Sequence, residues 1–95
     1  MTETIFRIPT PLRSLTDGAA EVTVEGTDVS SALRALGRRH EGILERLLDE
    51  NGTLRPFVNV FVGSTNLREL DGLETRLHEG DVLAIIPAVA GGGRP

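Results

Sequence analysis

Few side chains in this sequence could carry out covalent or metal chemistry. Cysteine is absent from the 95 residues, which excludes disulfides, thiolate nucleophiles, iron–sulfur clusters and cysteine-based zinc sites. His40 and His78 lie far apart among charged residues, so we interpret both as solvated surface histidines. No His, Ser and acidic residues are spaced as a general base and a nucleophile. We therefore expect no catalytic residue and no bound metal.

The glycine run Gly91-Gly92-Gly93 could take part in chemistry through its main chain. It does not resemble a phosphate-binding loop, because no helix behind it supplies a dipole. On composition alone, such a run is typical of a solvated chain end. We expect a folded domain over residues 1–90 and a flexible glycine-rich tail over residues 91–95.

Length and composition predict one globular domain that binds neither nucleic acid nor a membrane. The chain is 39% apolar and 25% charged, which suits a single buried core. Its formal charge is −4 and its ten basic residues, all arginines, are spread along the sequence, so no basic stripe faces a phosphate backbone. The N-terminus lacks signal-peptide features, and the longest apolar stretch, residues 82–90, is too short to span a bilayer. We expect a cytoplasmic protein whose acidic charge steers it toward a basic surface on another protein.

The first part of the chain predicts a hairpin followed by helices. Residues 4–8 and 20–25 read as two strands joined through the Asp17-Gly18 turn. Thr27 or Asp28 is placed to cap a helix that runs to about residue 39, and a shorter helix covers residues 42–49.

The second part predicts two further strands, over residues 57–62 and 82–86, with minor elements between them over residues 63–80. This order predicts an α+β fold in which one main helix packs across a mixed sheet of four to five strands and the last strand lies beside the first. That layout is the ubiquitin-like β-grasp.

The sequence resembles the ubiquitin-like sulfur carriers of the MoaD and ThiS superfamily. The resemblance is carried by Gly80-Asp81-Val82 and by the final run Ile86-Pro87-Ala88-Val89-Ala90-Gly91-Gly92. Residues 55–62 and 8–13 are similar to the CysO branch. In such carriers a separate enzyme uses ATP to adenylate the terminal glycine carboxylate, and sulfur then displaces AMP to leave a thiocarboxylate. The resemblance therefore implies that Gly92 is the reactive residue, that Gly91 is its spacer, and that the carrier binds no cofactor.

The chain departs from the family pattern because Gly93-Arg94-Pro95 follows the two glycines. As written, Gly92 has no free carboxylate. The resemblance implies that a JAMM-type zinc metallopeptidase removes the extra residues. Cleavage after Gly92 fits the family alignment, whereas cleavage after Gly93 would leave a triple-glycine end.

A docking surface is predicted on the strand at residues 57–62, because a sheet with one covering helix leaves its other face open. The side chains assigned to that face are Phe57, Asn59 and Phe61, with Arg55 and Arg68 as polar edges. The alternative is that the two phenylalanines pack beneath residues 63–77.

Four classes of function stay open. The leading one is a sulfur donor for cysteine or another sulfur-containing metabolite, acting with an adenylating enzyme and a sulfur-acceptor enzyme. The others are the small subunit of molybdopterin synthase, a ubiquitin-like protein modifier and a plain β-grasp interaction domain.

Overall fold

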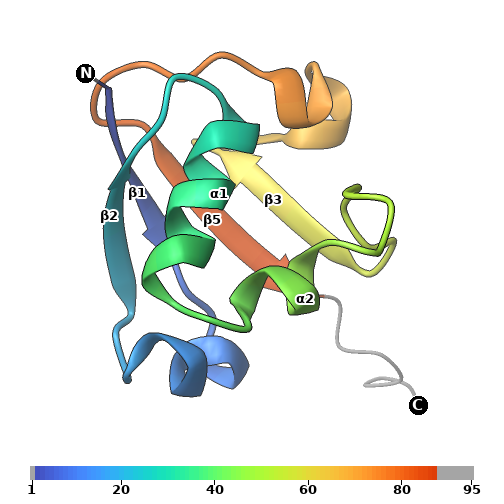
Figure 1. Ribbon diagram of the computed structural model, residues 1–95. Coiled ribbons are helices and arrows are strands. Elements are labelled where there is room, and N and C mark those ends of the chain that lie inside the picture. Colours follow the sequence, from blue (N-terminus) through green and yellow to red (C-terminus); the bar gives the residue numbers. More distant parts are fainter. Residues whose placement is uncertain (1, 88–95) are drawn as a thin grey trace.

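The computed structural model describes residues 2–87, which form a five-stranded mixed sheet with helices packed across one face (Figure 1). The strand order is β2-β1-β5-β3-β4. The expected domain boundary at residue 90 and the expected tail at residues 91–95 lie outside the described residues.

The first two strands form the predicted hairpin. β1 (Glu3–Arg7) pairs antiparallel with β2 (Glu21–Glu25), and inward residues such as Phe6 and Val22 are opposite each other in the core. The connection holds a 3₁₀ helix, η1 (Thr10–Thr16), which begins at the prolines and ends at Asp17 in the left-handed conformation. The sequence indicated only turns here.

α1 (Val29–Arg39) lies across the sheet and is capped by Asp28, one of the two predicted caps. The Asp28 carboxylate accepts from the Ser31 N–H at 2.8 Å, while the Ser31 hydroxyl accepts from the Asp28 N–H at 3.2 Å. The residues predicted from helical spacing are the ones buried, namely Val29, Ala32, Leu33 and Leu36. α2 (Ile43–Leu47) is shorter than predicted and adds Ile43 and Leu47 to the core.

The last strand, β5 (Val82–Pro87), occupies the middle of the sheet. It runs parallel to β1 and antiparallel to β3 (Val58–Val62), which confirms that the last strand lies beside the first. The Gly80-Asp81 turn holds the start of β5 against β1. The Ile5 N–H donates to the Asp81 carbonyl, and the Gly80 N–H donates to the Glu3 carbonyl. The Asp81 carboxylate closes the turn by accepting from the His78 N–H at 2.8 Å.

The minor elements between β3 and β5 are a two-residue strand and two 3₁₀ turns. These are β4 (Thr65–Asn66), η2 (Leu67–Glu69) and η3 (Gly72–Glu74). Leu67 anchors them in the core. The helices cover only one face of the sheet, so the arrangement is the predicted ubiquitin-like β-grasp (Figure 1).

Candidate docking surface at the end of the last strand

The end of β5 is the point from which the predicted tail continues. Pro87, the last described residue, is opposite Val58 in the sheet register, and Ile86 is opposite Asn59. The predicted reactive and processed residues are Gly91, Gly92, Gly93, Arg94 and Pro95, all outside the described residues. The described part of the chain therefore provides the surface around the base of the tail.

An apolar strip, the open-face patch, runs along the uncovered side of the sheet. In the register, Val82 is opposite Ile5 and Ala84 is opposite Phe61, so these side chains share one face with Ile86. Ile86 is 48% exposed and the other four are half-buried. The patch thus leads along β5 toward the start of the tail.

Asn59 also lies on the open face, but its amide oxygen is already engaged. It accepts from the Arg68 guanidinium at 2.7 Å and from the Asn66 amide at 3.2 Å. Arg68 further donates to the carbonyls of Val58 at 2.9 Å and Arg55 at 3.1 Å. The Arg68 clamp, formed by Arg68 with Asn59, Val58 and Arg55, ties the entry of β3 to η2.

Phe57 occupies a different setting from Phe61. It precedes the first residue of β3 and is 49% exposed. It lines a groove of about 360 Å³ together with residues of η1, α2 and β5, among them Leu12, Arg55 and Pro87. The predicted shared strand face therefore holds for Asn59 and Phe61 only. Strand alternation does not extend to a residue that precedes the ladder.

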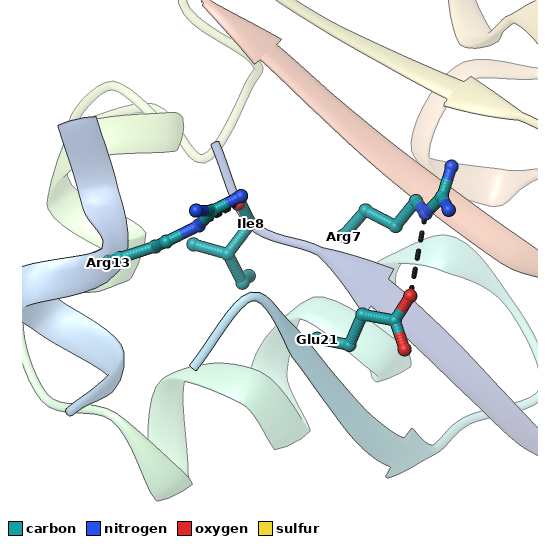
Figure 2. A network of polar contacts seen from close by, with 4 residues as sticks. All are labelled: Arg7, Ile8, Arg13 and Glu21. Atoms are coloured by element: carbon teal, nitrogen blue, oxygen red, sulfur yellow. Dashed lines mark hydrogen bonds and ion pairs between the residues drawn. The ribbon is translucent and has the colours of Figure 1, made fainter. Parts of the chain in front are cut away.

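A second groove, of about 310 Å³, lies between the β1–β2 hairpin and η1 and reaches Ile85 of β5. Figure 2 shows its polar side chains. Arg7 pairs with Glu21 across the hairpin at 3.5 Å, and both side chains are well exposed. The Arg13 guanidinium turns back toward the Ile8 carbonyl and donates from Nε at 2.9 Å (Figure 2).

Two aspartates of the described chain have pKa values that are shifted by local hydrogen bonds. The Ser31 N–H and the Ser31 side chain lower the pKa of Asp28, and hydrogen bonds from Thr53 lower the pKa of Asp49. Within residues 2–87, no three His, Asp or Glu side chains are grouped to hold a metal ion. The His78 side chain is 86% exposed and 3.8 Å from Asp81. No described helix is long and apolar enough to cross a membrane.

Comparison with known sequences identifies the family. The sequence model of the ThiS family matches residues 6–92, which takes in the whole described sheet from Phe6 onward and continues through Gly92. The chain belongs to the ThiS family. The resemblance to ubiquitin-like carriers predicted from the final strand and glycines is thereby confirmed.

This ThiS-family chain is similar to two curated relatives and to one solved structure. It is 40% identical over 87 residues to the sulfur carrier protein CysO of Mycobacterium tuberculosis, which covers 90% of this chain and 94% of the relative. It is 39% identical over 64 residues to the small archaeal modifier protein 3 of Haloferax volcanii, covering 67% and 68% respectively. In the crystal structure of the Amycolatopsis orientalis BexX/CysO complex, a chain 40% identical superposes with a TM-score of 0.88, covering 94% of this chain and 99% of that one. The predicted likeness to the CysO branch is confirmed.

Several surface residues of this ThiS-family chain are absent from the sequence prediction. Ile5, Val82, Ala84 and Ile86 join the open-face patch. The apolar run at residues 82–86 was a usable signal, because a sheet with one covering layer must leave alternate residues of its central strand uncovered. No comparable signal marks Arg13, whose hydrogen bond to Ile8 forms only in the folded chain.

Proposed function

We propose that this chain is a sulfur carrier whose reactive group is the main-chain carboxylate of Gly92. The single observation that carries the proposal is the ThiS-family match, which runs through residue 92. The 40% identity to CysO sulfur carrier proteins over most of both chains supports the same role. The chain then acts as a protein substrate for other enzymes and not as a catalyst.

The proposed chemistry takes place on the tail in two steps. The Gly92 carboxylate attacks the α-phosphorus of ATP in an activating enzyme, and pyrophosphate leaves. A hydrosulfide ion then attacks the Gly92 carbonyl, and AMP leaves with the electron pair of the broken C–O bond, which leaves a thiocarboxylate. If the sulfur comes from a persulfide, the same attack gives an acyl disulfide, and a second thiol must cleave its S–S bond to release the thiocarboxylate. Glycine suits this position because, without a Cβ, the chain can enter a narrow channel and present its carbonyl closely. The use of ATP favours the cytoplasm as the compartment.

Processing precedes activation in this proposal, because Gly93-Arg94-Pro95 follows Gly92 in the sequence. A JAMM-type zinc metallopeptidase would hydrolyse the Gly92–Gly93 peptide bond and free the carboxylate. Afterwards a biosynthetic enzyme would take the sulfur into cysteine or a related metabolite. The BexX/CysO complex is a precedent, in a relative, for a carrier of this fold in complex with another protein.

Docking on the activating enzyme is assigned to the open-face patch together with Phe57. Ile86 and Phe57 are large apolar side chains about half exposed, and both adjoin the last residues of β5. A partner that covers them would also receive the tail.

Intact-mass spectrometry tests the proposal. Three forms are mixed with the activating enzyme, ATP and a sulfur source, namely the full chain, a chain ending at Gly92 and a chain ending at Gly91. Only the form ending at Gly92 should gain the mass of one O-to-S exchange. Sulfur carriage is wrong if that form stays unchanged with an enzyme that loads another carrier.

A protein modifier is the second candidate, favoured by the identity to the small archaeal modifier protein 3. The same adenylate can be attacked by a lysine amine, which gives an amide to a target protein. Higher-mass conjugates in cells that survive hydroxylamine, which cleaves thioesters, would favour this role. Loss of all conjugates under hydroxylamine would favour sulfur transfer.

A further inference from the structure

Arg13 and Arg55 differ from the other arginines of the described chain. Of the nine arginines in residues 2–87, these two are half-buried and the other seven are exposed. Each is held through its inner nitrogen to a main-chain carbonyl. Arg13 Nε donates to Ile8 at 2.9 Å, and Arg55 Nε donates to Glu45 at 3.0 Å.

The outer nitrogens of these two guanidiniums are unused within the described chain. Neither group has a carboxylate within ion-pair distance in residues 2–87, and no hydrogen bond from their Nη atoms is made there. Arg68 and Arg39, by contrast, spend Nη atoms on carbonyls of their own chain. A guanidinium that is anchored at Nε and free at both Nη atoms is already oriented to donate two parallel hydrogen bonds to one carboxylate.

Both arginines stand beside the base of the tail. Arg13 lines the groove that reaches Ile85, and Arg55 lines the groove that ends at Pro87. Residues of η1 contribute to both grooves, so each guanidinium lines a groove that η1 shares with the last residues of β5. In an acidic chain with a formal charge of −4, this end therefore offers two oriented cations.

We infer that Arg13 and Arg55 bind acidic side chains at the mouth of the activating enzyme's tail channel and so orient the carrier there; this inference rests on the proposed function. The ligand is a protein carboxylate and not the nucleotide. Gly92 is five positions beyond Pro87, which places the reacting carbonyl up to roughly 17 Å away when that segment is extended. With the tail extended in this way, a phosphate at that carbonyl is beyond the reach of a side chain at the end of β5.

The inference refines the expectation from net charge. An overall charge of −4 still favours encounter with a basic surface at long range. The two anchored arginines act at contact distance, where the sign and geometry of individual groups decide how the two proteins align.

Steady-state activation of the chain ending at Gly92 tests the inference through carrier-dependent ATP–pyrophosphate exchange. The variant Arg13→Gln with Arg55→Gln should lower kcat/KM roughly tenfold at low salt, mainly through KM, with the difference shrinking as salt rises. The matched control is Arg34→Gln with Arg76→Gln, which removes the same charge from exposed positions near Asp28. That control should behave like the parent chain.

Four results would overturn the inference, and they separate it from the proposed function. An equal loss of kcat/KM in the Arg13 and Arg55 variant and in the control variant would show that net charge alone causes the effect. Unchanged kcat/KM in a folded Arg13 and Arg55 variant, with an active parent, would remove the docking inference alone. No exchange with the parent chain would remove the proposed function and the inference with it. If the glutamine variant unfolds, Arg13→Lys with Arg55→Lys keeps the charge but not the fork, and parent-like kcat/KM there would also overturn the inference.

Discussion

The guanidinium of Arg68 donates a hydrogen bond of 2.7 Å to the side-chain amide oxygen of Asn59. The same group reaches the carbonyls of Val58 and Arg55, so one exposed side chain from η2 holds the whole entry of β3. β3 in turn lies beside the last strand, with Val58 opposite Pro87. The Arg68 clamp therefore supports the strand that pairs with the last residues of β5.

Arg68→Ala should lower the free energy of unfolding by about 1–2 kcal/mol, because several hydrogen bonds to a charged donor are lost at a partly exposed site. Urea unfolding followed by far-UV circular dichroism measures this, since the chain has no tryptophan or tyrosine. Arg46→Ala is the control, because Arg46 is exposed and makes no side-chain hydrogen bond within residues 2–87. Equal losses in the two variants would argue against the clamp.

Thr4 offers a stabilising change. Its side chain is fully buried on β1, and its hydroxyl has no hydrogen-bond partner in the described chain. Thr4→Val keeps the shape and removes the cost of burying an unpaired polar atom, so the free energy of unfolding should rise by about 1 kcal/mol. Thermal and urea unfolding both measure the change.

The matched control for Thr4 is Thr16, which is also buried but is bonded. The Thr16 hydroxyl makes hydrogen bonds of 3.2 Å and 2.9 Å with the Arg13 and Ala19 carbonyls. Thr16→Val should therefore destabilise by about 1 kcal/mol. A gain in both variants would mean that hydrophobicity alone, and not the unpaired hydroxyl, sets the effect.

Gly26, which directly follows β2, packs closely against the backbone of α1. A Cβ there would lie 2.6 Å from the Ala32 nitrogen and 2.7 Å from its Cα, and these backbone atoms cannot move without shifting the helix. Gly26→Ala should cost about 2–3 kcal/mol of unfolding free energy. Gly37→Ala should cost less, because its new Cβ meets only the Leu44 side chain and alanine favours the helix. The reverse order in urea unfolding would contradict this packing.

Asp28 makes helix capping depend on pH. Its pKa is lowered in the folded chain, chiefly by the Ser31 N–H and then by the Ser31 side chain. A carboxyl group whose pKa is lowered by folding stabilises the folded chain at pH values above its unfolded pKa of about 4. That stabilisation is lost as the pH falls through the folded pKa.

Asp28→Asn tests the pH dependence, because asparagine also caps helices but does not titrate. The stability difference between parent and variant should be constant at neutral pH and should shrink below about pH 4. Asp28→Ala should cost about 1 kcal/mol at neutral pH through loss of the cap. If the stability difference between the parent and Asp28→Asn does not change with pH, the loss of stability in acid comes from another carboxyl group.

Regular elements with strong local patterns were predictable, and contacts made by tertiary packing were not. α1 followed from the spacing of Val29, Leu33 and Leu36 together with a cap at Asp28, because helix periodicity and capping are local properties. The start of β3 did not, because pairing of Val58 with Pro87 decides where the ladder begins and leaves Phe57 outside it. Residues 63–80 gave weak patterns because their turns depend on two core residues ten positions apart, Leu67 and Leu77.

The same distinction applies to the candidate site. Gly92 could be proposed as the reactive residue from sequence, because the final strand and the glycines after it are contiguous. The placement of Asn59 and Phe61 on an open face also followed from alternation. The anchored guanidiniums of Arg13 and Arg55 could not be foreseen, since each depends on a carbonyl brought near by folding.

The open-face patch gives a final prediction about partner docking. Phe61 and Ile86 lie on one sheet face without complete burial, so serine at either position should remove apolar contact area while leaving the core residues untouched. Each variant of the chain ending at Gly92 should show a roughly fivefold to twentyfold lower kcat/KM for activation, with a nearly unchanged unfolding midpoint. Leu70→Ser is the control, because Leu70 is 42% exposed at the end of η2, outside that patch. Phe57→Ser separates the two surfaces. A loss confined to Phe57 would place docking in the groove beside Pro87, whereas a loss confined to Phe61 and Ile86 would place it on the sheet.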